Sequence, residues 1–131
     1  MTEHPNAAAT RAAIEAFSKG DFETMVASLA DDVVWHIPGS NRFAGEFRGK
    51  AAVVEQFRSR EEAGVRTSID EIHDVVGNDE HVVALVRVGV SSADDSTSSN
   101  SVWVMHVADG KMLEFWGAND NQAGIDRVFG S

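Results

Sequence analysis

This chain of 131 residues has no cysteine, few basic residues and no long apolar run. The absence of cysteine excludes disulfides, thiolate metal sites and cysteine nucleophiles. With 11 Lys and Arg against 21 Asp and Glu, the net charge is −10, so we expect neither nucleic acid nor anionic membranes as partners. No stretch approaches the roughly 18 apolar residues of a membrane span, and the N-terminal segment lacks the features of a secretory signal. We therefore expect a cytoplasmic protein.

The hydrophobic content, 43%, is enough for one globular domain spanning residues 1–131. In the first half, apolar residues recur at helical spacing and predict helices over residues 6–19, 21–30 and 49–63. Their apolar faces contain Ala13 and Phe17, then Phe22, Met25, Val26 and Leu29, then Val53, Val54 and Phe57.

Strand patterns fill the second half, and one short strand occurs earlier. β-Branched and aromatic residues predict that early strand at residues 33–37, and alternation or turn residues bound later ones at 66–76, 81–90, 100–107 and 111–118. We interpret 40–48 as a structured loop or small hairpin, 91–99 as a polar loop, and 120–129 as a short terminal helix. Helices gathered on one side of a mostly antiparallel sheet give an α+β fold that can enclose a cavity.

The early strand and the last strand each carry an indole and an ionisable group near their ends. In the early strand these are Trp35 and His36. An imidazole in a dry pocket is suited to general acid/base chemistry, because its ordinary pKa lies near neutrality. The alternative is a core or rim histidine whose ring is satisfied by a backbone group.

After the last strand, Asp120 offers a second candidate for proton transfer. A carboxylate at the mouth of an apolar pocket has a raised pKa, which makes it a usable base. The alternative is that Asp120 is the N-cap of the terminal helix. Next to it, Asn119 can donate a hydrogen bond to a developing enolate oxygen.

Alternation divides the strand at 100–107 into two faces that are both mostly apolar. We assign Trp103 and Met105 to the interior and His106 to the outer face, although the reverse assignment is open. An apolar outer face needs a cover, and a second copy of the chain is the simplest one. The tryptophans Trp35, Trp103 and Trp116 can stack on a flat ligand or pack in the core.

The cluster of Asp70, Glu71, His73 and Asp74 has the composition of a metal site. On a strand, however, Glu71 and His73 share one face while the two aspartates share the other, which is typical of a solvated strand. No metal-ligand, phosphate-loop, dinucleotide or nucleophile-elbow motif occurs, so we predict no metal and no cofactor.

These stretches resemble the nuclear transport factor 2-like superfamily, specifically its SnoaL-like polyketide cyclase and ketosteroid isomerase branch. The resemblance runs from about residue 6 to 129 and is carried by Gly20-Asp21-Phe22, residues 29–36, residues 47–53, and residues 109–116 followed by Asp120. It implies a cone-shaped α+β barrel, with the sheet wrapped against three N-terminal helices around a deep pocket, and commonly a homodimer.

The same resemblance implies that Asp120 is the general acid/base of an aldol-type ring closure. The steroid isomerase pattern is not met, because Ile37 stands where its base would be, Trp103 where its second oxyanion acid would be, and the chain has no tyrosine. The epoxide hydrolase pattern would need Arg87 to point inward, against the alternation of its strand.

We expect an enzyme acting on a small apolar carbonyl compound, in which Asp120 or His36 moves the proton. The residues expected to shape its site are Phe17, Trp35, Phe57, Trp103, Met105, Trp116 and Asn119. The alternatives are a non-catalytic protein that binds a small apolar or aromatic molecule, and a structural module associating through its sheet. Enzymes need the proton-transfer group inside the pocket, so solvent-facing His36 and Asp120 would favour binding.

Overall fold

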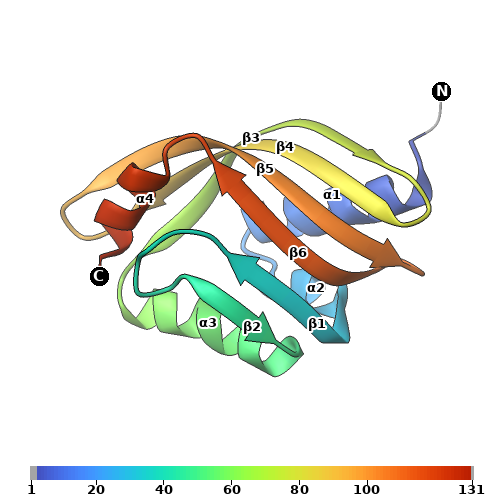
Figure 1. The fold of residues 1–131 in the computed structure, drawn as a ribbon, viewed down its shortest axis with the longest axis horizontal. Helices are drawn as coiled ribbons and strands as arrows, with labels where there is room; N and C mark the ends of the chain where they lie inside the picture. The colour runs from blue at the N-terminus through green and yellow to red at the C-terminus, as the bar shows by residue number, and fades with distance from the viewer. Residues whose placement is uncertain (1–2, 131) are drawn as a thin grey trace.

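The structure is a computed structural model that describes residues 3–130 (Figure 1). The helices are α1 (Pro5–Ser18), α2 (Phe22–Ala27), α3 (Lys50–Glu62) and α4 (Gln122–Phe129). The strands are β1 (Leu29–Ile37), β2 (Gly45–Arg48), β3 (Arg66–Gly77), β4 (His81–Ser91), β5 (Ser96–Ala108) and β6 (Lys111–Asn119).

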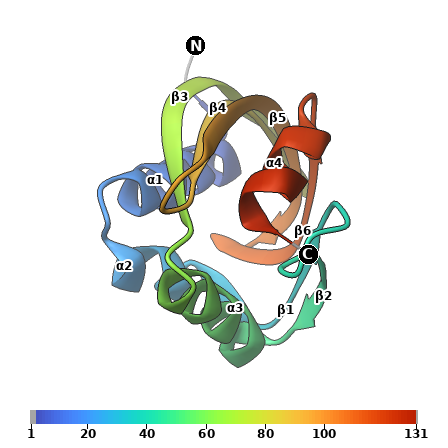
Figure 2. The same cartoon turned by 90° about the vertical axis from the view of Figure 1, so that its left-hand side faces the viewer.

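The strands form one sheet in the order β2-β1-β6-β5-β4-β3 (Figure 1). β1 and β6 run parallel, and the other neighbouring pairs are antiparallel. The predicted α+β fold is thus confirmed, but the sheet is not closed into the expected barrel. Helices occupy the open side between β2 and β3, so these two strands do not pair with each other (Figure 2).

Helices α1, α2 and α3 cover the concave side of the curved sheet, while α4 lies across one end (Figure 2). The main core joins the sheet to these helices through fully buried side chains such as Leu29, Val53 and Met105. A second cluster joins α4 to the sheet end and contains Phe43, Val65, Val90, Ile125, Val128 and Phe129. None of the helices within residues 3–130 is long and apolar enough to cross a membrane.

The alternation of β4 is as predicted. Its even positions from Val82 to Val90 are all buried, and Arg87 between them is exposed on the other face. Because successive side chains of a strand point to opposite faces, this strand presents one apolar row to the core. The structure therefore has a defined inner face, and the neighbouring strands follow its register.

The polar segment 91–99, predicted as a loop, is mostly strand. β4 and β5 continue their pairing as far as Ser91 and Ser96, which leaves only residues 92–95 as the turn. Arg87 Nη2 on β4 donates to Ser98 Oγ on β5 at 2.7 Å, which links the serine-rich part of β5 to the neighbouring strand. Low strand propensity is overridden here by the cross-strand hydrogen bonds.

One further boundary differs from the sequence-based expectation. β1 begins at Leu29, four residues early, because a register irregularity places Asp31 and Asp32 in solvent within the strand. In the segment expected to be a loop or small hairpin, β2 pairs antiparallel with β1, so the hairpin alternative is confirmed. The first helix is capped by His4, whose Nδ1 accepts from the Asn6 backbone at 3.1 Å.

Candidate functional site

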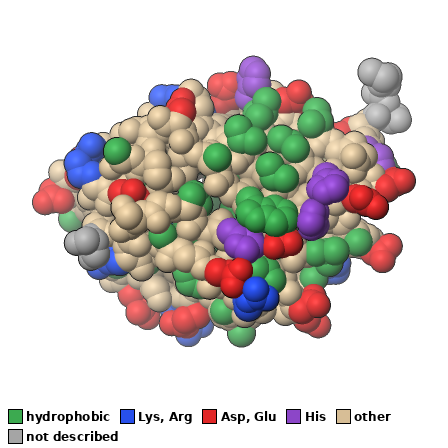
Figure 3. Space-filling model, in the orientation of Figure 1, with side chains coloured by type: hydrophobic (Ala, Val, Ile, Leu, Met, Phe, Trp, Pro, Cys, Tyr) green, Lys and Arg blue, Asp and Glu red, His purple; other side chains and the backbone are tan. Residues whose placement is uncertain are grey.

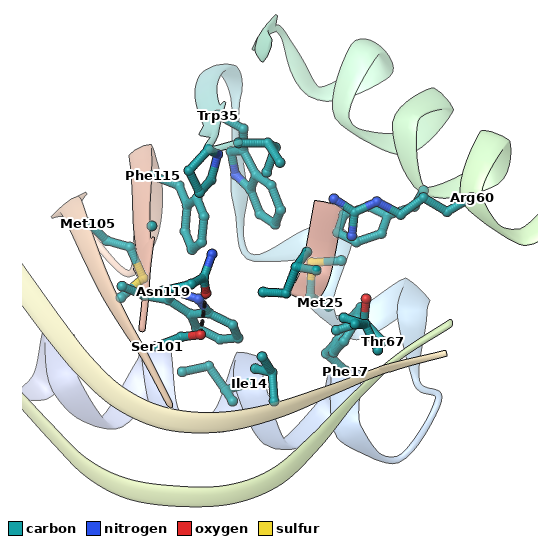
Figure 4. A pocket seen from close by; sticks show the side chains of 18 of the residues that line it. Ile14, Phe17, Met25, Trp35, Arg60, Thr67, Ser101, Met105, Phe115 and Asn119 are labelled. Atoms are coloured by element: carbon teal, nitrogen blue, oxygen red, sulfur yellow. Dashed lines mark hydrogen bonds between the residues drawn. The ribbon is translucent and has the colours of Figure 1, made fainter. Parts of the chain in front are cut away.

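Between the inner face of the sheet and the helices lies a cavity of about 130 Å³ (Figure 4). An engineered apolar cavity of roughly 150 Å³ holds benzene, so this space has the scale of one small ring. Its lining comes from α1, α3, α4 and several strands, and is mostly apolar. The predicted pocket residues that line it are Phe17, Trp35, Phe57, Trp103, Met105 and Asn119.

Aromatic rings form one continuous wall of the cavity. Trp35 stacks on Phe115 with centroids 4.5 Å apart and meets Phe57 edge-on at 5.3 Å. Trp103 contacts Phe115 from the other side at 5.6 Å. Such contacts fix ring orientations, so the wall is a formed surface for an apolar ligand.

Ser101 and Asn119 line the cavity and are joined by a hydrogen bond (Figure 4), and a chain of polar side chains continues from them. Ser101 Oγ donates a hydrogen bond to Asn119 Oδ1, and Asn119 Nδ2 donates to Gln122 Oε1 at 2.7 Å. Gln122 Nε2 in turn donates to Asp126 Oδ1 at 2.9 Å. The Asn119 amide is therefore held in one orientation, with one amide hydrogen not used in this network.

The carboxylate of Asp126 accepts most of the hydrogen bonds at the end of this network. It accepts from Asn41 Nδ2 at 2.7 Å, and from the backbone and hydroxyl of Ser40. Burial alone would raise the pKa of Asp126, but the hydrogen bonds from Asn41, Gln122 and Ser40 outweigh it and hold the pKa below its usual value. These contacts join the loop after β1 to α4.

Three hydrogen-bond donors that line the cavity have no partner within residues 3–130. They are Trp35 Nε1, Arg60 Nε and the Thr67 hydroxyl, all enclosed. Figure 4 shows Arg60 reaching from α3 toward the cavity. Sequence reasoning missed Arg60, although Val53, Phe57 and Arg60 share one helix face by their spacing.

Arg60 is half-buried, and its guanidinium lies over the rings of Phe57 and Phe129 at 5.4 and 5.1 Å. Burial lowers the pKa of Arg60 to about 10, because the charged form is poorly solvated. The group remains charged at neutral pH. It is the one ionisable side chain among the cavity-lining residues of the described chain.

His36 does not line the cavity, contrary to expectation. Alternation along β1 turns Trp35 inward and His36 to the outer face, where its ring stacks on Trp116 at 5.3 Å. Trp116, predicted as a pocket residue, is therefore also on the outer face. The parallel register pairs His36 with Trp116 and Trp35 with Phe115, which explains both corrections.

Asp120 is exposed and also lies outside the cavity lining. Hydrogen bonds from the side chain and backbone of Asn100, both at 2.9 Å, hold its pKa below the usual value. A raised pKa was expected, so this prediction is wrong. The N-cap of α4 is Asn121, whose side chain accepts from the Gly124 backbone.

On β5 the assignment of faces holds. Trp103 and Met105 line the cavity, whereas His106 is on the outer face beside His81, with ring centroids 4.7 Å apart. Within residues 3–130, no group of three or more histidine, aspartate or glutamate side chains is arranged to hold a metal ion.

Residues 10–115 match the family described as the SnoaL-like domain. No curated protein is significantly similar in sequence to this chain.

Solved structures share the fold at low identity. A protein of unknown function with a cystatin-like fold from Xanthomonas campestris has a TM-score of 0.90 and 22% identity, covering 98% of this chain and 100% of its own. An NTF2-like protein from Burkholderia xenovorans LB400 has a TM-score of 0.81 and 22% identity, and the match covers 99% of each chain. A candidate polyketide cyclase from Pseudomonas putida KT2440 has a TM-score of 0.78 and 19% identity, and the match covers 97% of this chain and 99% of that protein.

Proposed function

Because this chain belongs to the SnoaL-like domain family of the nuclear transport factor 2-like superfamily, we propose that its interior cavity binds one small, largely apolar molecule. The observation that carries the proposal is the aromatic wall formed by Trp35, Phe57, Trp103 and Phe115 along one side of the cavity. Concave, mostly apolar pockets with a few convergent polar groups are the usual form of small-molecule sites.

Binding without acid/base catalysis agrees best with the lining. No carboxylate or imidazole is among the cavity-lining residues of the described chain. Proton transfer needs such a group within hydrogen-bond reach of the substrate. With His36 and Asp120 outside the lining, the ligand-binding reading takes precedence over the enzymatic one.

Catalysis on a small carbonyl compound is the second candidate. It is favoured by one observation: Ser101 and Asn119 line both the cavity and an outer hollow that Asp120 borders. In this reading Asp120 or His36 moves a proton near that wall, and Asn119 donates to the enolate oxygen. The substitution Asp120→Asn or His36→Ala would then abolish turnover of the carbonyl substrate and leave its binding affinity intact.

A cavity-filling variant tests the binding proposal. Ala13 lines the cavity from α1, whereas the neighbouring Ala12 is exposed. Ala13→Phe should remove saturable binding of fluorobenzene, followed by its ¹⁹F NMR signal, because the new ring occupies the space. Ala12→Phe is the matched control and should bind like the natural protein. Absence of saturable binding to the natural protein would overturn the proposal.

We also propose that the chain forms a homodimer through the outer sheet face. Figure 3 shows hydrophobic side chains gathered with histidines on this face. Val76, Leu85 and Val102 are 53%, 36% and 40% exposed there. Exposed apolar side chains gathered on one face favour association, and an isologous dimer would cover this face of each copy with the same face of the other.

A further inference from the structure

We propose that the cavity selects ligands that carry an anionic oxygen group, a carboxylate on a small aromatic ring, with Arg60 as the charge partner. This inference rests on the proposed function, because it names the chemical class of the same ligand. It is carried by the unpaired donors of the lining and by the single charge among them.

The first support is the uncompensated charge of Arg60. The guanidinium forms no ion pair within residues 3–130, and its Nε is enclosed without a partner. The rings of Phe57 and Phe129 hold it from the sides by cation–π contact, which supplies no acceptor. Because a half-buried charge loses part of its hydration and here gains no ion-pair partner, a ligand anion would replace the interactions with water that Arg60 loses.

The second support is the polarity of the unmet groups. Trp35 Nε1 and the Thr67 hydroxyl are enclosed donors that line the same cavity as Arg60. Among the described residues, the other enclosed side-chain polar atom without a partner is Gln56 Oε1, which belongs to a residue outside the cavity lining. The indole and guanidinium N–H groups can only donate, and the Thr67 hydroxyl can also donate, so the complementary ligand presents oxygen acceptors.

The third support is the placement of Arg60 in the fold. It lies near the end of α3, where its carbonyl accepts from the Val65 backbone at 3.1 Å, and Thr67 follows at the start of β3. Its contact with Phe129 brings α4 to the same place. The donors of α3 and β3 can therefore meet the oxygens of a ligand whose ring lies against the aromatic wall (Figure 4).

A purely structural role is the competing explanation, in which Arg60 only fastens α4 through Phe129. The two explanations differ in ligand charge. A fastening residue affects charged and neutral ligands of one shape equally, whereas an anion partner discriminates between them.

A matched ligand pair makes that distinction. 4-Fluorobenzoate and 4-fluorobenzamide have nearly the same shape and differ in charge, and ¹⁹F NMR titration reports the binding of each. We expect 4-fluorobenzoate to bind roughly tenfold or more tightly than the amide, as charge-assisted hydrogen bonds would give. Arg60→Met should remove this preference and leave the affinity for the amide nearly unchanged.

The controls separate charge from packing. Arg58→Met removes an exposed arginine from the same helix and should keep the preference. Thr67→Val leaves Arg60 in place and should lower the affinity for 4-fluorobenzoate severalfold. This variant provides the test if Arg60→Met does not fold. Equal affinity for the two probes, or an unchanged preference in both variants, would overturn this inference alone. Failure of fluorobenzene and both probes to bind would overturn the proposed function itself.

Discussion

His36 and Glu114 form the closest pair of ionisable side chains on the outer sheet face, with Nε2 and Oε2 2.7 Å apart. Glu114 also lies 3.5 Å from His106 Nδ1, so one carboxylate serves two imidazoles. The His36 ring stacks on Trp116 in a nearly coplanar arrangement. These contacts place His36 in the surface that we propose as the dimer interface, on the side of the sheet opposite the cavity.

We expect His36→Ala to leave cavity binding unchanged within about twofold, because the side chain does not line the cavity. Its effect should fall on association, since the change removes both the hydrogen bond to Glu114 and the stacking contact with Trp116. Fluorobenzene titration and light scattering measure the two properties. A large loss of fluorobenzene affinity in a folded variant would contradict this placement.

Asp120→Asn should also retain ligand binding, because the carboxylate is exposed and hydrogen-bonded away from the cavity to Ser99 and Asn100. The pKa of Asp120 should lie below the ordinary aspartate value, because the hydrogen bonds from Asn100 stabilise the charged form. An NMR titration of the natural protein measures this directly. A pKa above the ordinary value would instead support a role as general base.

Asp126→Ala should lower the free energy of unfolding by about 1–3 kcal/mol at neutral pH, because several buried or half-buried donors lose their acceptor. The folded pKa of Asp126 is depressed, so its contribution is present above the unfolded value near 4. It is lost as the pH falls through the folded pKa.

Urea unfolding of the natural protein and Asp126→Ala at pH 7 and below pH 4 checks this dependence. The difference between the two proteins should shrink in acid. Asp94→Ala, in the turn between β4 and β5, is a suitable control because that side chain is exposed and forms no hydrogen bond or ion pair within residues 3–130. A difference that persists unchanged in acid would count against the assigned role of Asp126.

Leu85→Glu should shift the protein to the monomer, because a charge would be introduced among the exposed apolar side chains of the outer face. The position is exposed on β4, so the fold itself should tolerate the change. Light scattering at micromolar concentration gives the oligomeric state. Ala12→Glu, on the exposed side of α1, is the matched control and should remain dimeric, and a monomeric natural protein would refute the interface.

Much of the fold follows from local patterns. Helical spacing in residues 22–29 and strict alternation from Val82 to Val90 report directly on burial, because each period matches one kind of backbone. Alternation likewise separated Trp103 and Met105 from His106. Turn and cap residues such as Asp21 mark element ends for equally local reasons.

The composition of the cavity was decided by the tertiary structure. The parallel register of β1 on β6 turns Trp35 and Phe115 inward and His36 and Trp116 outward, and no local pattern specifies the pairing of strands that lie so far apart in the chain. Arg60 is a similar case. From the sequence alone, the charged end of its helix is typical of a solvent-exposed surface, and only the packing of α4 and of the segment before β3 against Arg60 places it at the cavity. The sequence determined which residues share a face, whereas long-range packing decided which faces enclose the cavity.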